Sequence, residues 1–380
     1  MIKILDFYTL ILFVFINNLF LYKYGSRLDI INIYGLIFGY NLFLFSIFYS
    51  VIKIKLSNTA INLIFGSIVF LFFCVTVYVN ISVDGENLNV DRWSAMSNSI
   101  KALLNNEYPY TAQTHLGKGS SNLPSIFFIG FPFYVLGNVG FLQSFSFLLY
   151  SFILFKTLKN PKAKLVGILL LTLSIFYWWE IYAKSDLMTN FIIILGFILY
   201  SEMKKIDFTK PYLLGLISGF LLYTRLVAII PLSILLFKNF INVSLKTKVK
   251  FISTGLIIIL ILSFLIFRNC PNIETFINYN PFNLQKKSSQ FPIYLSFILI
   301  LFPLYFSLKI KKSKQIIDFS VLLLSLTVLL SFSMVFYTYG FSKIINNHLF
   351  DISYFNLITP FIIYKIAFLV DNSKFIYSKK

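Results

Sequence analysis

Long runs of apolar residues, separated by short polar turns, recur along almost the whole chain. Several of them reach about 18 residues, the length that a helix needs to cross a bilayer core of roughly 30 Å. Inside a bilayer the backbone N–H and C=O groups must be bonded within the segment, which favours α-helices. Only 12% of the residues are charged and 58% are hydrophobic, whereas soluble domains are about a quarter charged. The sequence therefore predicts an all-α, polytopic membrane protein.

We expect about twelve transmembrane helices. The first apolar run begins almost at Met1 and lacks a small-residue cleavage site, so we expect a retained span and not a cleaved signal peptide. Two of the runs are too short to cross as straight helices, which predicts tilted or broken segments there. The twelve approximate ranges are 5–22, 30–52, 60–80, 141–156, 165–182, 187–201, 211–223, 226–238, 250–267, 291–308, 316–338 and 350–370.

The net charge of +19 comes from lysines in short clusters between the apolar runs, which argues against a nucleic-acid partner. A cytoplasmic N-terminus would place most of the 33 basic residues in cytoplasmic turns, as the positive-inside rule requires. Both chain ends are then cytoplasmic. The chain divides into three N-terminal spans (1–80), an extracytoplasmic loop (81–140) and the remaining helices (141–380).

Arginine is rare in this lysine-rich chain. The four arginines are Arg27, Arg92, Arg225 and Arg268, and all of them fall on the extracytoplasmic side in this arrangement. A guanidinium binds phosphate or carboxylate through two parallel hydrogen bonds, which an ammonium cannot do. The arginines are therefore candidates for such contacts, and a chance distribution is the alternative.

The loop 81–140 is the longest polar interval and contains two predicted helices. After Asp91, the apolar residues Trp93, Met96, Ile100, Leu103 and Leu104 have the spacing of one helix face. This helix is too short to span, so we expect it to lie in the membrane interface. A loop rich in Gly and Pro follows, and "SIFFIGFPFYVLG" predicts a second interfacial helix.

Asp91 supports two interpretations. An acidic residue at the start of a helix can accept hydrogen bonds from the first N–H groups and interacts favourably with the helix dipole. Alternatively, a carboxylate at the membrane surface can act as a general base toward a hydroxyl group.

The order of these segments resembles the first extracytoplasmic loop of the GT-C superfamily. Its members are membrane glycosyltransferases that use polyprenyl-phosphate donors. The resemblance rests on an outward span, "DRW", an amphipathic helix, "YPY", a Gly/Pro loop and "PSIFFIGFPFYVLG". "YWWEIYAKSDLMTNF" is similar to the second acidic region of the superfamily. "LLGLISGFLLYTRLVAIIPLSILLF" is similar to its Gly-containing segment and Pro-bearing span. The resemblance covers roughly residues 70–240.

The resemblance implies a reaction and roles for named residues. A sugar would leave a polyprenyl phosphate, whose oxygens need cationic stabilisation, first from Arg225 and then from Arg92 or Lys184. Asp91 would act as the base in a displacement that inverts the anomeric carbon, and Asp186 would be a second catalytic acid that orients the base, positions Lys184 or binds the acceptor. An ordinary structural ion pair of Asp186 with Lys184 or Arg225 is the alternative.

Other residues are candidates for substrate binding under the same resemblance. The aromatic ones would stack on sugar rings, although a membrane-interface belt is their alternative. Glu180 lies in a span, where ionisable side chains are costly and often functional.

Arg268, with Lys286 and Lys287, lies in a later loop where it would bind phosphate or an acidic glycan, with plain solvation as the alternative. A surface role is the alternative for His115, and also for His348. The substrate-binding set is Arg92, Trp93, Tyr108, Tyr110, His115, Glu180, Lys184, Arg225 and Arg268.

The chain departs from the usual pattern of the superfamily. It has two additional spans before the loop, and it has Asp91 alone where adjacent acids are common, with Asp84 and Glu86 upstream. Which acid is the base therefore stays open. The sequence shows no metal-ligand spacing and leaves a divalent cation open as a cofactor.

The expected setting is a multi-pass protein of the bacterial inner membrane. Its active site would face the periplasmic side, with a polyprenyl-phosphate sugar as donor and a glycan, lipid or protein as acceptor. The alternatives are a transporter or flippase of lipid-linked or polar substrates, a polysaccharide polymerase or ligase, and a structural membrane subunit. The chain lacks the two similar halves that carriers often show. Its long loop also comes early, whereas polymerases place theirs late.

Overall fold

The computed structural model describes residues 2–27, 32–289, 293–346 and 349–372. These residues form α-helices and two 3₁₀ helices, and their only strand-like pairing is an isolated bridge between Gln113 and Gly119. The helices of the first half are α1 (Ile2–Gly25), α2 (Ile33–Lys53), α3 (Asn58–Ser82), α4 (Arg92–Leu104), α5 (Pro124–Val135), α6 (Phe141–Thr157), α7 (Pro161–Thr172), α8 (Ile175–Tyr182) and α9 (Leu187–Lys204). The second half contains α10 (Pro211–Leu222), η1 (Leu226–Ala228), α11 (Ile229–Asn242), α12 (Leu245–Phe267), α13 (Ile273–Asn278), α14 (Pro281–Ser289), α15 (Ile293–Leu308), α16 (Lys314–Tyr339), α17 (Phe341–Asn346), η2 (Ile352–Leu357) and α18 (Thr359–Asn372).

Within these ranges, six helices are long and apolar enough to cross a membrane: α1, α2, α3, α9, α12 and α16. The pair α7 and α8 would add a seventh span if it crosses as one broken segment, because its two halves meet at a bend of 58°. The prediction of an all-α membrane protein is confirmed, but the predicted number of twelve spans is not. The other predicted spans fall in shorter helices, including α6, α10 and α15.

The bend between α7 and α8 explains one difference in detail. The apolar run 165–182 predicts a single span, but the helix stops at Thr172 and restarts at Ile175. The hydroxyl of Ser174 donates to the carbonyl of Leu170, and the indole N–H of Trp178 donates to the carbonyl of Thr172. These bonds satisfy carbonyl groups that lack a helical partner at the break. The backbone can therefore change direction within a run that is apolar throughout.

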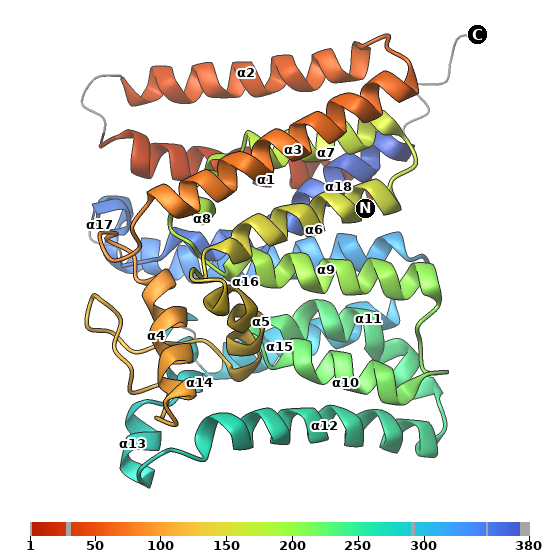
Figure 1. Cartoon of the computed structure of the whole chain (residues 1–380). Coiled ribbons are helices and arrows are strands. Elements are labelled where there is room, and N and C mark those ends of the chain that lie inside the picture. The colour runs from red at the N-terminus through yellow and green to blue at the C-terminus, as the bar shows by residue number, and fades with distance from the viewer. Residues whose placement is uncertain (1, 28–31, 290–292, 347–348, 373–380) are drawn as a thin grey trace.

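The helices form a bundle whose two lateral edges are α2 and α12 (Figure 1). Only 11% of the most apolar window of either helix is buried, compared with 67% for α9 and 56% for α16. The exposed faces of α2 and α12 are apolar, which suits contact with lipid. Helices α4, α13, α14 and α17 lie toward one end of the bundle, whereas α1 begins at the other (Figure 1).

Glycines allow α10 and α12 to pack closely. A Cβ atom added at Gly219 would lie 2.6 Å from the backbone oxygen of Gly255, and one added at Gly215 would lie 2.3 Å from that of Phe251. Small residues at such spacing let two helix backbones approach each other inside a membrane, where the hydrophobic effect does not drive helix association.

A buried ionic cluster joins α1, α16 and α18. Lys365 of α18 is 1% exposed, and its Nζ lies 3.1 Å from the carboxylate of Asp318 in α16. It also lies 3.6 Å from the carboxylate of Asp6 and donates to the carbonyl of Leu5, both in α1. Charges inside an apolar bundle are costly unless paired, so this cluster holds the three helices together.

The loop 81–140 contains two helices, α4 and α5, where the sequence predicts them, and their position in a membrane interface stays a prediction. Met96 and Ile100 are buried beneath them in a small hydrophobic cluster separate from the main core. The predicted apolar face is wrong at Leu104, which is 51% exposed, while Ser94 and Ser99 are buried. Both serines donate to backbone carbonyl groups, which makes burial of their hydroxyls tolerable.

Candidate active site

A buried ion pair connects the start of α9 with the turn after α10. The guanidinium of Arg225 lies 2.6 Å from the carboxylate of Asp186, and the two side chains are 5% and 3% exposed. The same nitrogen of Arg225 lies 3.2 Å from the amide oxygen of Asn122, just before α5. The Nε of Arg225 is buried without a hydrogen-bond partner. This nitrogen is thus a donor that no described residue uses.

A second ion pair lies at the start of α4. Arg92 donates to the carboxylate of Asp351 and, at 3.4 Å, to the hydroxyl of Ser353. Its guanidinium also lies 5.8 Å from the ring centre of Tyr354. Asp351 is the N-cap of η2, because its side chain accepts the N–H of Ser353 at 2.9 Å. The side chain of Asp351 is 41% exposed, so its carboxylate is partly desolvated but not sealed from solvent.

The two members of this pair shift each other's pKa. Burial would raise the pKa of Asp351, but the charge of Arg92 and the hydrogen bonds from Ser353 outweigh it and lower the pKa below 3.8. Burial would lower the pKa of Arg92, but the charges of Asp351 and Asp186 raise it instead. Both groups are therefore charged at neutral pH.

Glu180, near the end of α8, is fully buried. Its two carboxylate oxygens accept the N–H of Met188 at 2.6 Å and the side-chain amide of Asn356 at 2.7 Å. These bonds join α8, α9 and η2. Glu180 and Arg92 both lie within electrostatic range of Asp186.

The structure thus brings four predicted site residues and one other acid into a single group. We call this group the charged cluster, and it consists of Arg92, Glu180, Asp186, Arg225 and Asp351. The proposed structural pairing of Asp186 with Arg225 is present. Each arginine reaches its carboxylate through one terminal nitrogen, so the other guanidinium donors could bind a phosphate while the acids hold the guanidinium planes in place.

Asp91 stands at the N-cap position of α4, but its side chain does not cap the helix. Its carboxylate instead accepts the hydroxyl of Thr114 at 3.1 Å. The expectation that Asp91 caps is therefore wrong, and its partly buried carboxylate is held by the Gly/Pro loop. Arg92, the next residue, carries its side chain into the charged cluster, and consecutive Cα atoms are only about 3.8 Å apart.

His115 connects the Gly/Pro loop with the residues before α4. Its two ring nitrogens lie 2.6 Å from the hydroxyl of Ser94 and 2.7 Å from the carbonyl of Leu88. With both nitrogens engaged, the imidazole stabilises the loop next to Thr114, the partner of Asp91. Its role in substrate binding stays a prediction.

Trp93 and Lys184 meet at a junction between the ends of α3 and α8. The indole N–H of Trp93 donates to Asn138 at 3.0 Å, and the ammonium of Lys184 donates to the carbonyl of Asn80 at 3.0 Å. That ammonium also lies 5.7 Å from the indole ring centre. Burial lowers the pKa of Lys184, and the charge of Asp84 acts in the opposite direction.

Tyr108 and Tyr110 lie inside the small hydrophobic cluster under α4 and α5, and each is no more than 2% exposed. The hydroxyl of Tyr110 donates to the carbonyl of Asn122 at 2.9 Å. Asn122 also contacts Arg225, so Tyr110 supports the backbone that carries this contact. Stacking on a sugar would need a ring face that is covered here.

Arg268 lies away from the charged cluster. It is exposed at the end of α12, and its guanidinium donates to Asn106 at 3.3 Å. The side chains of Lys286 and Lys287 and residue His348 lie outside the part of the chain that the structure describes. Among the described residues no group of three or more His, Cys, Asp or Glu side chains is placed to hold a metal ion.

The sequence pattern does not indicate that Asp351, Asn356 and Asn122 belong to this site. The run 350–370 predicts a span, whereas its first residues form a cap and a 3₁₀ helix. The stretch "DIS" carries a usable signal, because an Asp two residues before a Ser commonly forms a turn in which the carboxylate accepts that N–H. Comparisons with protein-family models, with curated proteins and with solved structures found no match.

Proposed function

We propose that this chain is a glycosyltransferase that moves a sugar from a polyprenyl phosphate to an acceptor hydroxyl, at the extracytoplasmic face of a bacterial inner membrane. The observation that supports the proposal best is the charged cluster, with two buried or half-buried arginines held by carboxylates beneath α4. It lies in a bundle of apolar helices that suits a lipid-linked donor.

The arginines would stabilise the leaving phosphate. Arg225 uses one terminal nitrogen for both Asp186 and Asn122, and its Nε is unpartnered. A guanidinium has five N–H donors, so donors remain for phosphate oxygens. Arg92 offers a second cation whose plane is set by Asp351 and Tyr354. Donors fixed before the reaction stabilise developing charge without reorganisation.

Asp91 is our choice for the base. Asp186 and Asp351 are each paired with an arginine that they hold in place, so they are positioning residues in this proposal. Among the described residues, the carboxylate of Asp91 accepts only a hydrogen bond from the neutral hydroxyl of Thr114. It would take the proton from the acceptor hydroxyl. That oxygen then bonds to the anomeric carbon as the carbon–oxygen bond to phosphate breaks and its electron pair stays on the phosphate.

The deciding experiment uses the purified full-length protein in proteoliposomes with a panel of radiolabelled polyprenyl-phosphate sugars and a membrane glycan extract as acceptor. We expect the wild-type protein to consume a donor and Asp91→Asn to lose this activity. Asp84→Asn is the matched control, because Asp84 is an exposed acid seven positions earlier that bonds only its own turn in the described structure. The proposal is wrong if the wild-type protein consumes no donor of the panel, or if Asp91→Asn transfers at the wild-type rate.

A further inference from the structure

An open groove lies between α3 and α6, on a part of the surface that is rich in apolar side chains. Its volume is about 450 Å³, within the range of ligand sites, and most of its lining is apolar or aromatic. Phe65, Phe70, Phe152 and Phe155 are among the lining residues. Gly66 opens the floor, since a Cβ atom added there would contact nothing within 4 Å.

Two lysines lie at one end of this groove. The ammonium of Lys164 lies 4.3 Å from the ring centre of Phe155, and that of Lys156 lies 5.6 Å from the ring centre of Phe152. Both rings line the groove. The carboxylate of Asp371 is nearby: it accepts the backbone N–H groups of the turn that precedes α7, and its charge acts on Lys164. Two lysines against one carboxylate leave a net positive charge at this end of the groove.

Asn62 adds a polar atom to the same lining. Its side-chain oxygen is buried and has no hydrogen-bond partner. It lies one helical turn before Phe65, whose ring stacks on Phe155 at 6.3 Å, so it is at the end of the groove that carries the lysines. An unpartnered buried acceptor is costly, and a hydroxyl donor from a ligand would satisfy it.

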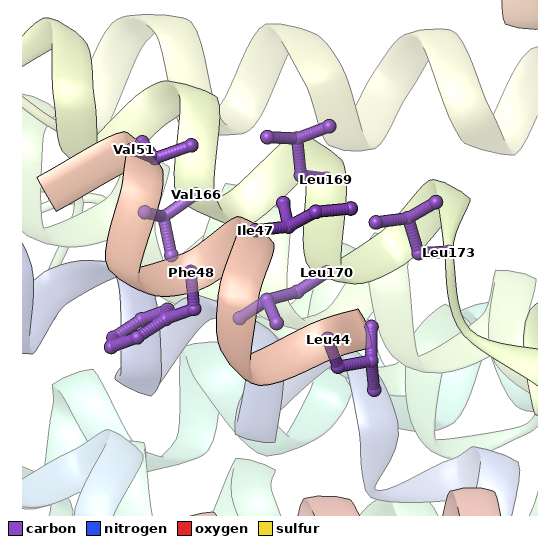
Figure 2. A pocket seen from close by; sticks show the side chains of 8 residues that line it. All are labelled: Leu44, Ile47, Phe48, Val51, Val166, Leu169, Leu170 and Leu173. Carbon is purple, nitrogen blue, oxygen red and sulfur yellow. The ribbon is translucent and has the colours of Figure 1, made fainter. Parts of the chain in front are cut away.

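A second apolar groove provides a comparison. It lies between α2 and α7, and Figure 2 shows the eight side chains that line it, among them Leu44, Phe48 and Leu173. Its volume is only about 10 Å³ and all eight side chains are hydrocarbon. This groove offers neither the space nor the polar groups of the groove between α3 and α6.

We propose that the groove between α3 and α6 binds one acidic glycerophospholipid of the surrounding bilayer, with a hydroxyl in its head group. An acyl chain would lie along the phenylalanines, the phosphate would bind Lys156 and Lys164, and the hydroxyl would donate to Asn62. Basic residues at a membrane surface attract anionic lipid in this way. The groove is distant from the junction of Trp93 and Lys184, because Asn62 and Asn80, whose carbonyl accepts the ammonium of Lys184, are 18 residues apart along α3, or about 27 Å at 1.5 Å per residue.

The test measures lipid binding to delipidated full-length protein in detergent by native mass spectrometry, with phosphatidylglycerol titrated against phosphatidylcholine. We expect saturable binding of one phosphatidylglycerol molecule, and weaker binding of phosphatidylcholine. Each lysine should contribute about fivefold, so Lys156→Gln with Lys164→Gln should weaken binding roughly 25-fold. Gly66→Leu should fill the groove and also weaken binding.

Matched controls separate this site from general surface charge. Lys248 and Lys250 also rest on aromatic rings, at 5.7 and 5.1 Å, but contact Phe240 and Tyr212 away from the groove. Their double change to Gln should leave binding unchanged, and so should Gly39→Leu, where an added Cβ atom also meets open space. Equal binding of the two lipids, or equal losses in the control variants, would overturn the proposal. So would a dimer in detergent that Gly66→Leu dissociates, since a second copy would then occupy the groove.

Discussion

Arg225 and Asp186 are 39 positions apart in the chain, yet their side chains form a 2.6 Å ion pair that is almost fully buried. The pair joins the turn after α10 to the start of α9. The guanidinium of Arg225 also contacts Asn122, at the end of the Gly/Pro loop. A charge in such a place is tolerated only with its partner, so each residue depends on the other.

Changing Asp186 to Asn should destabilise the protein by about 3–5 kcal/mol, because it leaves the Arg225 charge buried and uncompensated. Combining Asp186→Leu with Arg225→Met should recover most of this loss while abolishing sugar transfer. Thermal unfolding of the detergent-solubilised protein, with transfer assayed in parallel, measures both effects. A wild-type melting temperature for Asp186→Asn would contradict this account of the pair.

Changing Asp91 to Asn should lower the rate of transfer by a factor of about 10²–10⁴, the usual contribution of a general base. Folding should be unaffected, because the amide oxygen can still accept the hydroxyl of Thr114 and no cap bond is lost. The measurement is kcat with donor in excess, together with the melting temperature. A large loss of stability would show that the role of Asp91 is structural.

Acid should weaken the link between α4 and η2. The pKa of Asp351 is lowered in the folded state, so its contribution to stability is present above pH 3.8 and is lost as the pH falls through the folded-state pKa. Asp351→Asn should therefore reduce the melting temperature at pH 7 and have little effect once the pH lies below the folded-state pKa of Asp351. The comparison uses wild type and variant over the same pH series, and a constant difference across the series would refute this assignment.

Enlarging Gly219 should separate α10 from α12. A Cβ atom there would lie 2.6 Å from the backbone oxygen of Gly255, so Gly219→Val cannot be accommodated without moving a helix. We expect a loss of about 1–3 kcal/mol, typical of overpacking. Gly35→Val is the control, since its added atoms would meet open space. Melting temperatures of the two variants in one detergent provide the test.

The sequence predicted the helical class and the two helices of the loop because these depend on composition and on apolar spacing along one segment. It failed to predict the number of long spans, because hydropathy does not register a backbone break such as the one at Ser174. The resemblance to the GT-C superfamily identified Arg92, Glu180, Asp186 and Arg225 among the candidate site residues. Asp351 was missed because its pairing with Arg92 joins positions 259 residues apart, which no local pattern encodes.

Lys365 gives the chain an order of assembly. It lies in the last described helix, α18, which has only 14 residues and carries this buried charge. Such a segment is a poor candidate for independent insertion, because its ammonium would enter hydrocarbon without a counter-ion. Asp6 and Asp318 are made earlier during synthesis and supply that counter-ion from α1 and α16. We therefore expect α18 to join a bundle that is already in the membrane and that holds these two carboxylates.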